Sequence, residues 1–174
     1  MSKPPHRLFP GATYFVSTAT WERRELFRVP EVADILVRRI LACRDRGAFL
    51  LHEFVVLPNH FHLLITPGET TTLEKAIQLI KGGSSHEIHA QRGTRMEIWQ
   101  IGFHEWSVRD AEDYLTKVAY IRMNPVRARL VERPQDWALG SASGRFSIDP
   151  APEKFSAATS GAKAPQIRSH VRPG

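Results

Sequence analysis

The segment LPNHFHLLI (57–65) places two histidines one residue apart. In a β-strand, successive side chains point to opposite faces, so His60 and His62 share one face and Phe61 points to the other. Two neutral imidazoles on one face can supply two nitrogen ligands to a divalent metal ion. A half-exposed strand also tolerates such a pair without a metal, so the pair indicates a metal site only if a partner group lies nearby.

A tyrosine and an asparagine one helical turn apart form the second group. Tyr120 and Asn124 are spaced i, i+4 in the segment YIRMNPVRARLV (120–131), which puts them on one face of a helix. Tyr120 lies about 140° from the apolar Leu115 on a helical wheel, so it projects from a polar face, where a phenol can act as a nucleophile once activated. The alternative is a rim tyrosine, with Asn124 as the N-cap of a helix that begins at Pro125.

The spacing of apolar residues predicts the elements that position these groups. Alternating and β-branched segments predict strands, and apolar residues at helical spacing predict helices. In chain order the predicted elements are a strand (13–20), a helix (31–45), two strands (49–57 and 60–66), a helix from Leu73 that stops at Gly82-Gly83, a strand (97–108) and a helix from Asp110 that ends or kinks at Asn124-Pro125.

This order predicts an α+β fold. The first six elements follow the ferredoxin-like β-α-β-β-α-β pattern, and a C-terminal helix follows them. The pattern gives an antiparallel sheet with helices on one face and leaves the other face available. Many functions use this topology, so the fold by itself does not identify one.

Length and composition limit the class of protein. The 174 residues, 42% of them hydrophobic, predict one domain over 1–146 and a flexible tail over 147–174, where Ala, Ser, Pro and Gly predominate. The single cysteine, Cys43, excludes a disulfide framework. We expect a cytoplasmic protein, since neither a membrane span nor a secretory signal is visible. The net charge of +6 favours a polyanionic partner.

The two segments together resemble the signatures of single-tyrosine HUH transposases, in the same order and at the same separation. The Y-I-x-x-N-P-V-x-A form of the second resembles the REP-associated tyrosine transposase branch in particular. The resemblance extends over about residues 8–146 and departs at Glu105-Trp106, where relatives more often have aspartate and histidine. Three further segments resemble the first strand, the linker into the tyrosine helix and the usual ending of that family: YFVSTAT (14–20), FHEWSVRDAEDY (103–114) and WALGSASGRF (137–146).

The resemblance implies a metal-dependent enzyme that cleaves and rejoins single-stranded or hairpin DNA through a 5′-phosphotyrosine. By this resemblance, His60, His62 and Asn124 hold the metal ion, which would be Mg²⁺ or Mn²⁺. Tyr120 matches the nucleophile, and Tyr114, about 120° away on the helix, is the second choice. The REP-associated branch implies a monomer. A dimer that exchanges the tyrosine helix, as in insertion-sequence relatives, is the alternative.

Basic side chains could contact DNA phosphates, and exposed aromatic rings could stack on unpaired bases. Lys117 is in addition a candidate base for activating the tyrosine. The candidate stacking rings are Trp21, Trp99 and Trp106, although Trp99 fits a core position better. The candidate phosphate contacts are Arg23, Arg24, Lys81, Arg92, Arg95, Arg109, Lys117, Arg127 and Arg129.

Two other functions are compatible with the residues. A ferredoxin-like sheet with aromatic side chains can bind single-stranded nucleic acid without cutting it, although no RNP-type aromatic signature is visible. A hydrolase that activates water on a metal at His60 and His62 would need a carboxylate partner, and Glu53 is the only nearby candidate.

Overall fold

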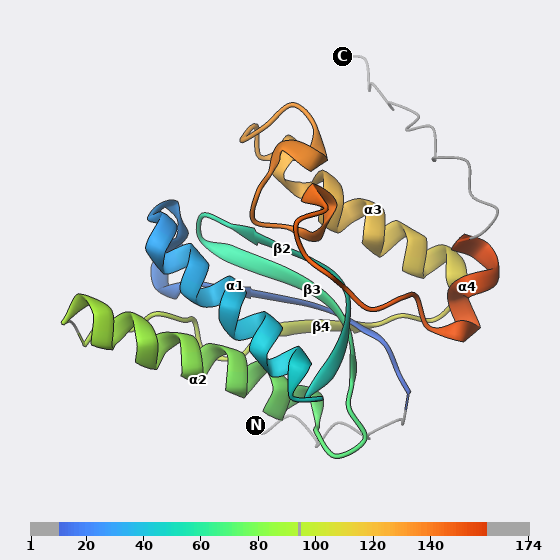
Figure 1. The fold of residues 1–174 in the computed structure, drawn as a ribbon, viewed down its shortest axis with the longest axis horizontal. Helices are drawn as coiled ribbons and strands as arrows, with labels where there is room; N and C mark the ends of the chain where they lie inside the picture. The colour runs from blue at the N-terminus through green and yellow to red at the C-terminus, as the bar shows by residue number, and fades with distance from the viewer. Residues whose placement is uncertain (1–10, 94, 160–174) are drawn as a thin grey trace, which may run out of the picture.

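Four antiparallel strands form a single sheet in the computed structural model, which describes residues 11–93 and 95–159 (Figure 1). The spatial order of the strands is β2-β3-β1-β4. This is the order expected of the ferredoxin-like pattern, so the α+β fold prediction is confirmed. The strands are β1 (Tyr14–Ala19), β2 (Phe49–Leu57), β3 (His60–Pro67) and β4 (His104–Ser107).

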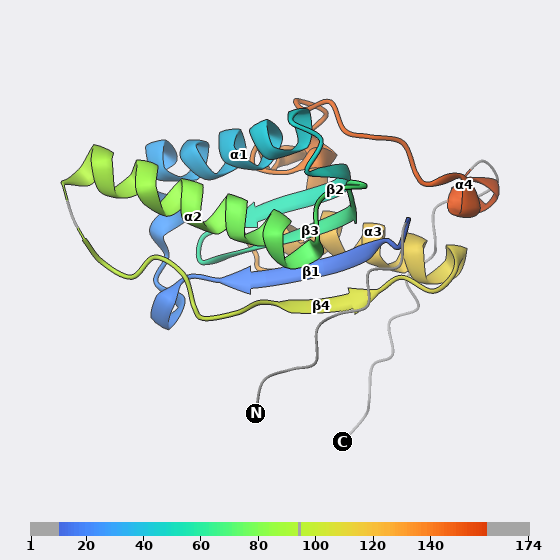
Figure 2. The same cartoon turned by 90° about the horizontal axis from the view of Figure 1, so that it is seen from below.

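Helices cover both faces of the sheet. Helices α1 (Pro30–Asp45) and α2 (Leu73–Arg92) lie side by side on one face (Figure 2), where Phe61 and other strand residues form the main core. Helix α3 (Ala111–Arg127) packs on the opposite face, and a short α4 (Glu153–Thr159) packs against α3. The sheet face that the sequence analysis expected to be open is therefore partly covered by α3. No helix in the described ranges is long and apolar enough to cross a membrane.

The fourth strand is shorter than predicted. Only His104–Ser107 pairs with β1 as a strand, while residues 97–103 approach the sheet through an isolated bridge between Thr20 and Trp99. Two features interrupt the predicted 97–108 strand. Gly102 has a φ of 72°, and the Trp99 ring turns into the core, where its Nε1 donates to the Lys81 carbonyl at 3.2 Å.

Helix α2 continues through Gly82 and Gly83, where the sequence predicted a stop. A Cβ at position 83 would lie 2.5 Å from the Arg39 Nε, so the glycine leaves room for this α1 side chain, which pairs with Glu87 of α2. The helix ends at Arg92, and the next residue, Gly93, has the left-handed φ of 63°.

Helix α3 also continues past its predicted end. It runs through Pro125 to Arg127, so the interpretation of Asn124 as a helix N-cap is wrong. The proline removes one backbone donor, but its ring is buried and the Asn124 carbonyl still accepts from the Ala128 N–H at 2.9 Å. A proline in the last helical turn therefore does not end this helix.

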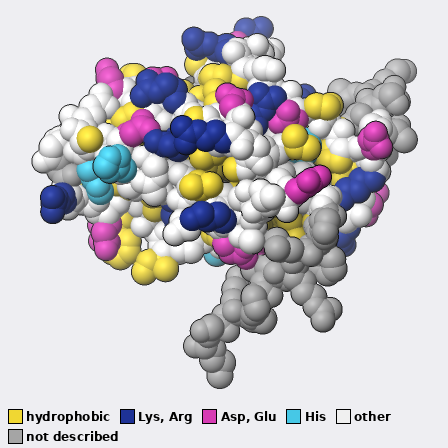
Figure 3. Space-filling model, turned by 60° about the horizontal axis from the view of Figure 1, so that its bottom comes forward, with side chains coloured by type: hydrophobic (Ala, Val, Ile, Leu, Met, Phe, Trp, Pro, Cys, Tyr) yellow, Lys and Arg dark blue, Asp and Glu magenta, His cyan; other side chains and the backbone are white. Residues whose placement is uncertain are grey.

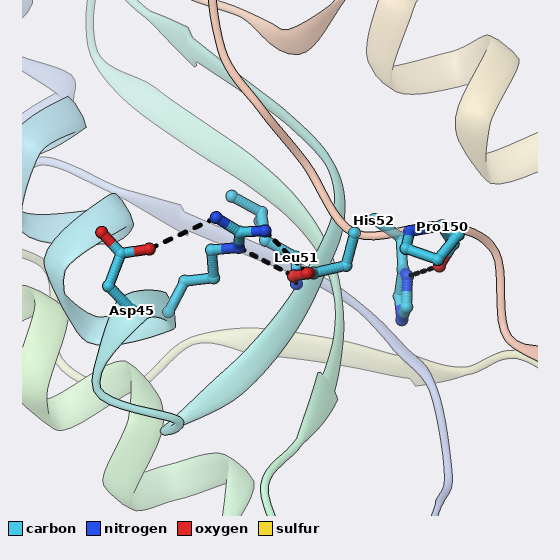
Figure 4. A network of polar contacts seen from close by, with 6 residues as sticks. Asp45, Leu51, His52 and Pro150 are labelled. Carbon is cyan, nitrogen blue, oxygen red and sulfur yellow. Dashed lines mark hydrogen bonds and ion pairs between the residues drawn. The ribbon is translucent and has the colours of Figure 1, made fainter.

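Part of the segment predicted to be a flexible tail packs against the domain. The backbone of Asp149 pairs with Leu51 of β2, and its carboxylate accepts from Arg44 at 2.7 and 2.9 Å. His52 Nδ1 lies 2.7 Å from the Pro150 carbonyl (Figure 4). Phe155 of α4 is buried, so the ordered domain extends beyond residue 146. Residues 160–174 of the predicted tail lie outside the described residues.

Candidate active site

Strand β3 presents His60 and His62 side by side, as the alternation of side chains predicted. Their ring centroids are 4.9 Å apart, and the planes are almost perpendicular. Phe61, between them, points into the core on the opposite face and is fully buried. His62 lies in the middle of the sheet, with Ser17 of β1 and Val55 of β2 as its neighbours across the strands.

Burial keeps both histidines neutral at physiological pH. Desolvation, followed by the positive charge of Arg23, lowers the pKa of His60 to about 4. Desolvation, followed by the neighbouring His60, lowers the pKa of His62 to about 3. A neutral imidazole keeps a lone pair on one ring nitrogen, and this is the form that binds a metal ion.

The hydrogen bonding of His60 and His62 is compatible with a ligand bound between their rings. His60 Nδ1 lies 2.7 Å from the Asn59 Oδ1, which fixes a proton on Nδ1 and leaves the Nε2 lone pair free. Both ring nitrogens of His62 are buried without a hydrogen-bond partner among the described residues. An unsatisfied buried polar atom is costly, so a cation or another polar ligand would stabilise this site.

A metal ion here would need oxygen ligands in addition to the two imidazoles. In ranges 11–93 and 95–159, no three His, Cys, Asp or Glu side chains are grouped so that they could hold a metal ion. Asn124 lies one turn beyond Tyr120 on α3 and is half-buried, so its side chain is on the same face of the helix as Tyr120. Substrate phosphate and water are the usual remaining ligands of Mg²⁺.

Helix α3 brings Tyr120 onto the histidine pair. Its ring centroid lies 5.4 Å from that of His62 and 5.6 Å from that of Phe15, and it meets both rings edge to face. The side chain is 38% exposed, so a phosphate could reach its hydroxyl. Two residues 58 positions apart in the sequence thus meet within one chain, over the face that carries His62.

The second candidate tyrosine is not available for chemistry. Tyr114 is only 3% exposed and stacks on Phe155 with a centroid distance of 5.1 Å. Burial, followed by the charge of Glu53, raises the pKa of its phenol to about 12. Tyr114 therefore joins the core under α3, and Tyr120 is the tyrosine beside the histidines.

Two basic side chains flank Tyr120. The Arg127 guanidinium lies 5.3 Å from the centre of the Tyr120 ring. The Lys117 ammonium lies 5.3 Å from the centre of the Phe15 ring and 3.9 Å from an Asp113 carboxylate oxygen. Both positive charges are placed where they could contact a phosphate that approaches the tyrosine.

Two other residues predicted to contact DNA, Lys81 and Arg24, donate hydrogen bonds to the backbone of the domain. Lys81 donates to the carbonyls of Gln100 and Gly102 at 2.7 Å each, and burial lowers the pKa of its ammonium. The Arg24 guanidinium donates to the Glu97 carbonyl. Lys81 and Arg24 thus donate to backbone carbonyls of the segment before β4, and their contacts with DNA stay a prediction.

The remaining predicted contacts are exposed but dispersed. The face drawn in Figure 3 carries Lys and Arg side chains in several groups with acidic side chains between them. Arg109 lies 3.5 Å from an Asp113 oxygen, and Arg129 is exposed with a φ of 56°. The other exposed members are Arg23, at the turn that faces His60, and Arg92 and Arg95, at the carboxyl end of α2.

Sequence reasoning missed the role of Glu53. Its carboxylate is 1% exposed and accepts hydrogen bonds from the Arg122 Nε, at 2.8 Å, and from the Ser141 hydroxyl. Arg122 lies on α3, two residues after Tyr120. Glu53 therefore binds α3 to the sheet through Arg122 and is not available as the carboxylate ligand of a metal hydrolase. A buried glutamate inside the apolar run FLLHEFVVL was the only signal in the sequence.

The fold and site define a transposase of the tyrosine type. Residues 11–124 match the sequence model for IS200-like transposases, so the chain belongs to that family. The REP-associated tyrosine transposase of Escherichia coli K12 is 29% identical over 145 residues, which cover 80% of this chain and 84% of that protein.

A solved structure agrees with this assignment. It is described as a REP-associated tyrosine transposase bound to a REP hairpin, and it matches 97% of this chain and 100% of its own with a TM-score of 0.68 and 27% identity. The resemblance to the REP-associated branch, seen first in the tyrosine signature, is confirmed.

Proposed function

We propose that this protein cleaves and rejoins single-stranded or hairpin DNA of the REP type, with Tyr120 as the nucleophile. The observation that carries the proposal is the position of the Tyr120 ring 5.4 Å from His62, half-exposed and within one chain. The relatives support the choice of substrate, because one of them was solved with a REP hairpin bound.

The chemistry requires one phosphoryl transfer in each direction. The Tyr120 oxygen attacks the scissile phosphorus, a bond forms between them, and the bond from phosphorus to the 3′ oxygen breaks. The phenolic proton leaves to solvent water, and the departing 3′ oxygen gains a proton. The Lys117 ammonium, three residues before Tyr120, has no lone pair to accept a proton and contributes positive charge instead. Rejoining reverses these steps with a 3′ hydroxyl as the attacking group, so no external energy source is needed.

We assign His60, His62 and Asn124 as the ligands of a divalent ion, Mg²⁺ or Mn²⁺. Such an ion would polarise the phosphate and offset the charge that develops on its oxygens. The fit rests on the neutral state of both imidazoles and on the unpartnered nitrogens of His62. Arg127, beside the Tyr120 ring, and Lys117, beside the Phe15 ring, would contribute further positive charge.

The same-chain geometry favours a monomer that completes its own site. The contact between Tyr120 and His62 needs no second subunit. Sedimentation or light scattering of the purified protein should give the mass of one chain. A tight dimer would support the alternative in which α3 is exchanged between subunits.

The assignment of the nucleophile is tested by two tyrosine variants. Tyr120→Phe removes one oxygen and keeps the ring, so DNA affinity should hardly change while the covalent protein–DNA adduct disappears. Tyr114→Phe is the matched control, since Tyr114 is buried in the core, and should keep most of the activity. The assay is gel detection of an adduct on a labelled hairpin oligonucleotide in Mg²⁺ or Mn²⁺.

The outcomes separate the candidate functions. Cleavage without an adduct in both the parent protein and Tyr120→Phe would support a hydrolase that uses water. DNA binding by the parent, with neither cleavage nor an adduct on any hairpin or single strand, would support a binding protein. Wild-type levels of adduct in Tyr120→Phe would show that another residue is the nucleophile.

A further inference from the structure

Trp106 is exposed at the edge of the sheet, next to the candidate active site. Its side chain is 48% exposed, although a ring of this size is usually largely buried. Trp106 pairs with Phe15 across the strands β4 and β1, so both rings lie on the same face of the sheet. The Phe15 ring in turn stacks on His62 at 5.2 Å. One aromatic ring therefore separates Trp106 from the histidine pair.

The surroundings of the Trp106 ring are aromatic and basic. Phe15 contacts it at 5.4 Å with a tilt of 48°, and His104, two residues earlier on β4, lies nearly parallel at 6.2 Å. The Lys117 ammonium lies 6.0 Å from the ring centre. An exposed aromatic surface beside a positive charge is the arrangement with which proteins bind a base and the phosphate attached to it.

Trp106 also has a fixed place relative to the proposed nucleophile. Phe15 contacts Trp106 at 5.4 Å on one side and Tyr120 at 5.6 Å on another, while Lys117 reaches both Phe15 and Trp106 from α3. A strand whose phosphate lies at Tyr120 would bring a neighbouring nucleotide over β4. The indole is thus placed to receive a base close to the cleaved bond.

We propose that Trp106, with His104, forms a stacking site for an unpaired nucleobase next to the scissile phosphate, and that Lys117 contacts the adjoining phosphate. The proposal rests on the proposed function, because it takes the position of the phosphate from Tyr120. The ligand is single-stranded DNA, since the bases of a duplex are stacked on each other and cannot lie on the ring.

The test measures binding without cleavage. All variants carry Tyr120→Phe, and the probes are three fluorescein-labelled DNAs of equal length: a single-stranded oligo(dA), the same strand paired with oligo(dT), and a strand in which every base is replaced by an abasic site. Trp106→Ala should weaken binding of the single strand about 5- to 150-fold, the range found when a stacking aromatic is removed. Binding of the duplex and the abasic strand should change less than about twofold.

Matched variants separate stacking from other effects. Trp106→Phe keeps an aromatic face and should recover most of the lost affinity. Leu50→Ala truncates an apolar side chain that is 51% exposed on β2, at the other edge of the sheet, and should leave all three affinities unchanged. Lys117→Ala should weaken binding of all three DNAs and lower the salt dependence of binding, because it removes a phosphate contact.

The outcomes decide the proposal independently of the nucleophile. Equal weakening of the single strand and the abasic strand by Trp106→Ala would overturn the proposal, since no base would then be recognised. An unchanged affinity for the single strand would overturn it as well. Because binding is measured without the Tyr120 hydroxyl, a failure of the nucleophile assignment would appear only in the adduct assay, and a failure of the stacking site only here.

Discussion

The buried ion pair between Glu53 and Arg122 should determine how firmly the helix that carries Tyr120 is held on the sheet. Arg122→Ala would leave the Glu53 carboxylate almost completely buried with the Ser141 hydroxyl as its remaining partner. Removing one partner of a fully buried pair costs about 3–5 kcal/mol. The Arg122 side chain is 49% exposed, so water already screens part of the interaction. We therefore expect a loss of about 2 kcal/mol.

The pH dependence of the stability loss distinguishes an unpaired buried charge on Glu53 from a loss of side-chain packing. Burial raises the pKa of Glu53, and Arg122 opposes that rise, so the variant should raise the pKa of the carboxyl further. A folded-state pKa above the unfolded value penalises folding at high pH, and the penalty is relieved as pH falls through the folded pKa. The deficit of Arg122→Ala relative to the parent should therefore be largest at pH 7 and smaller at pH 5.

Urea denaturation at the two pH values measures both quantities. Arg133→Ala breaks an ion pair with Asp136 in which both side chains are exposed, and it should cost less than about 1 kcal/mol at either pH. Adding Glu53→Gln to Arg122→Ala removes the buried charge and should restore part of the stability. A deficit below about 0.5 kcal/mol, or one that is the same at pH 5 and pH 7, would refute the reasoning.

Three further predictions follow from the site and its surroundings. In metal-free protein, His60 and His62 are neutral when the chain is folded but bind protons below pH 6.5 when it is unfolded. The free energy of unfolding should therefore fall as the pH drops from 6.5 towards 4, by about 1.4 kcal/mol per histidine at pH 5.5. Urea titrations that gave the same pH profile for a double His→Asn variant would contradict this. His62→Ala, or EDTA added to the parent protein, should abolish adduct formation. The DNA affinity, measured by fluorescence anisotropy, should stay within a few fold of the parent value. Full cleavage in EDTA would exclude the metal-dependent mechanism. Phe155→Ala should lower the free energy of unfolding by about 3 kcal/mol, since it empties a buried position against Tyr114. It should also make the C-terminal segment more sensitive to limited proteolysis. Resistance equal to that of the parent would show that the stacked pair does not hold the segment.

Short-range sequence patterns were sufficient to predict the type and order of the strands and helices and the direction in which His60, His62 and Tyr120 face. The two-residue period of a strand put His60 and His62 on one face and Phe61 in the core, and the structure confirms this arrangement. The position of Tyr120 on a polar face of its helix was also readable, because it depends only on the helical period. The order of strands and helices predicted the sheet topology, since few topologies are compatible with it.

Contacts between distant residues decided the rest. Helix α3 continues through Pro125, and α2 through Gly83, because neighbouring elements favour helix where local propensity does not. No local pattern could show that Tyr120 meets His62 or that the C-terminal segment packs on β2. The low pKa values of the histidines also arise from burial, which is a property of the assembled fold. The sequence alone specified which groups are present and which way each faces within its element, whereas packing determined which groups meet and in which protonation state, because both depend on atoms brought together from separate parts of the chain.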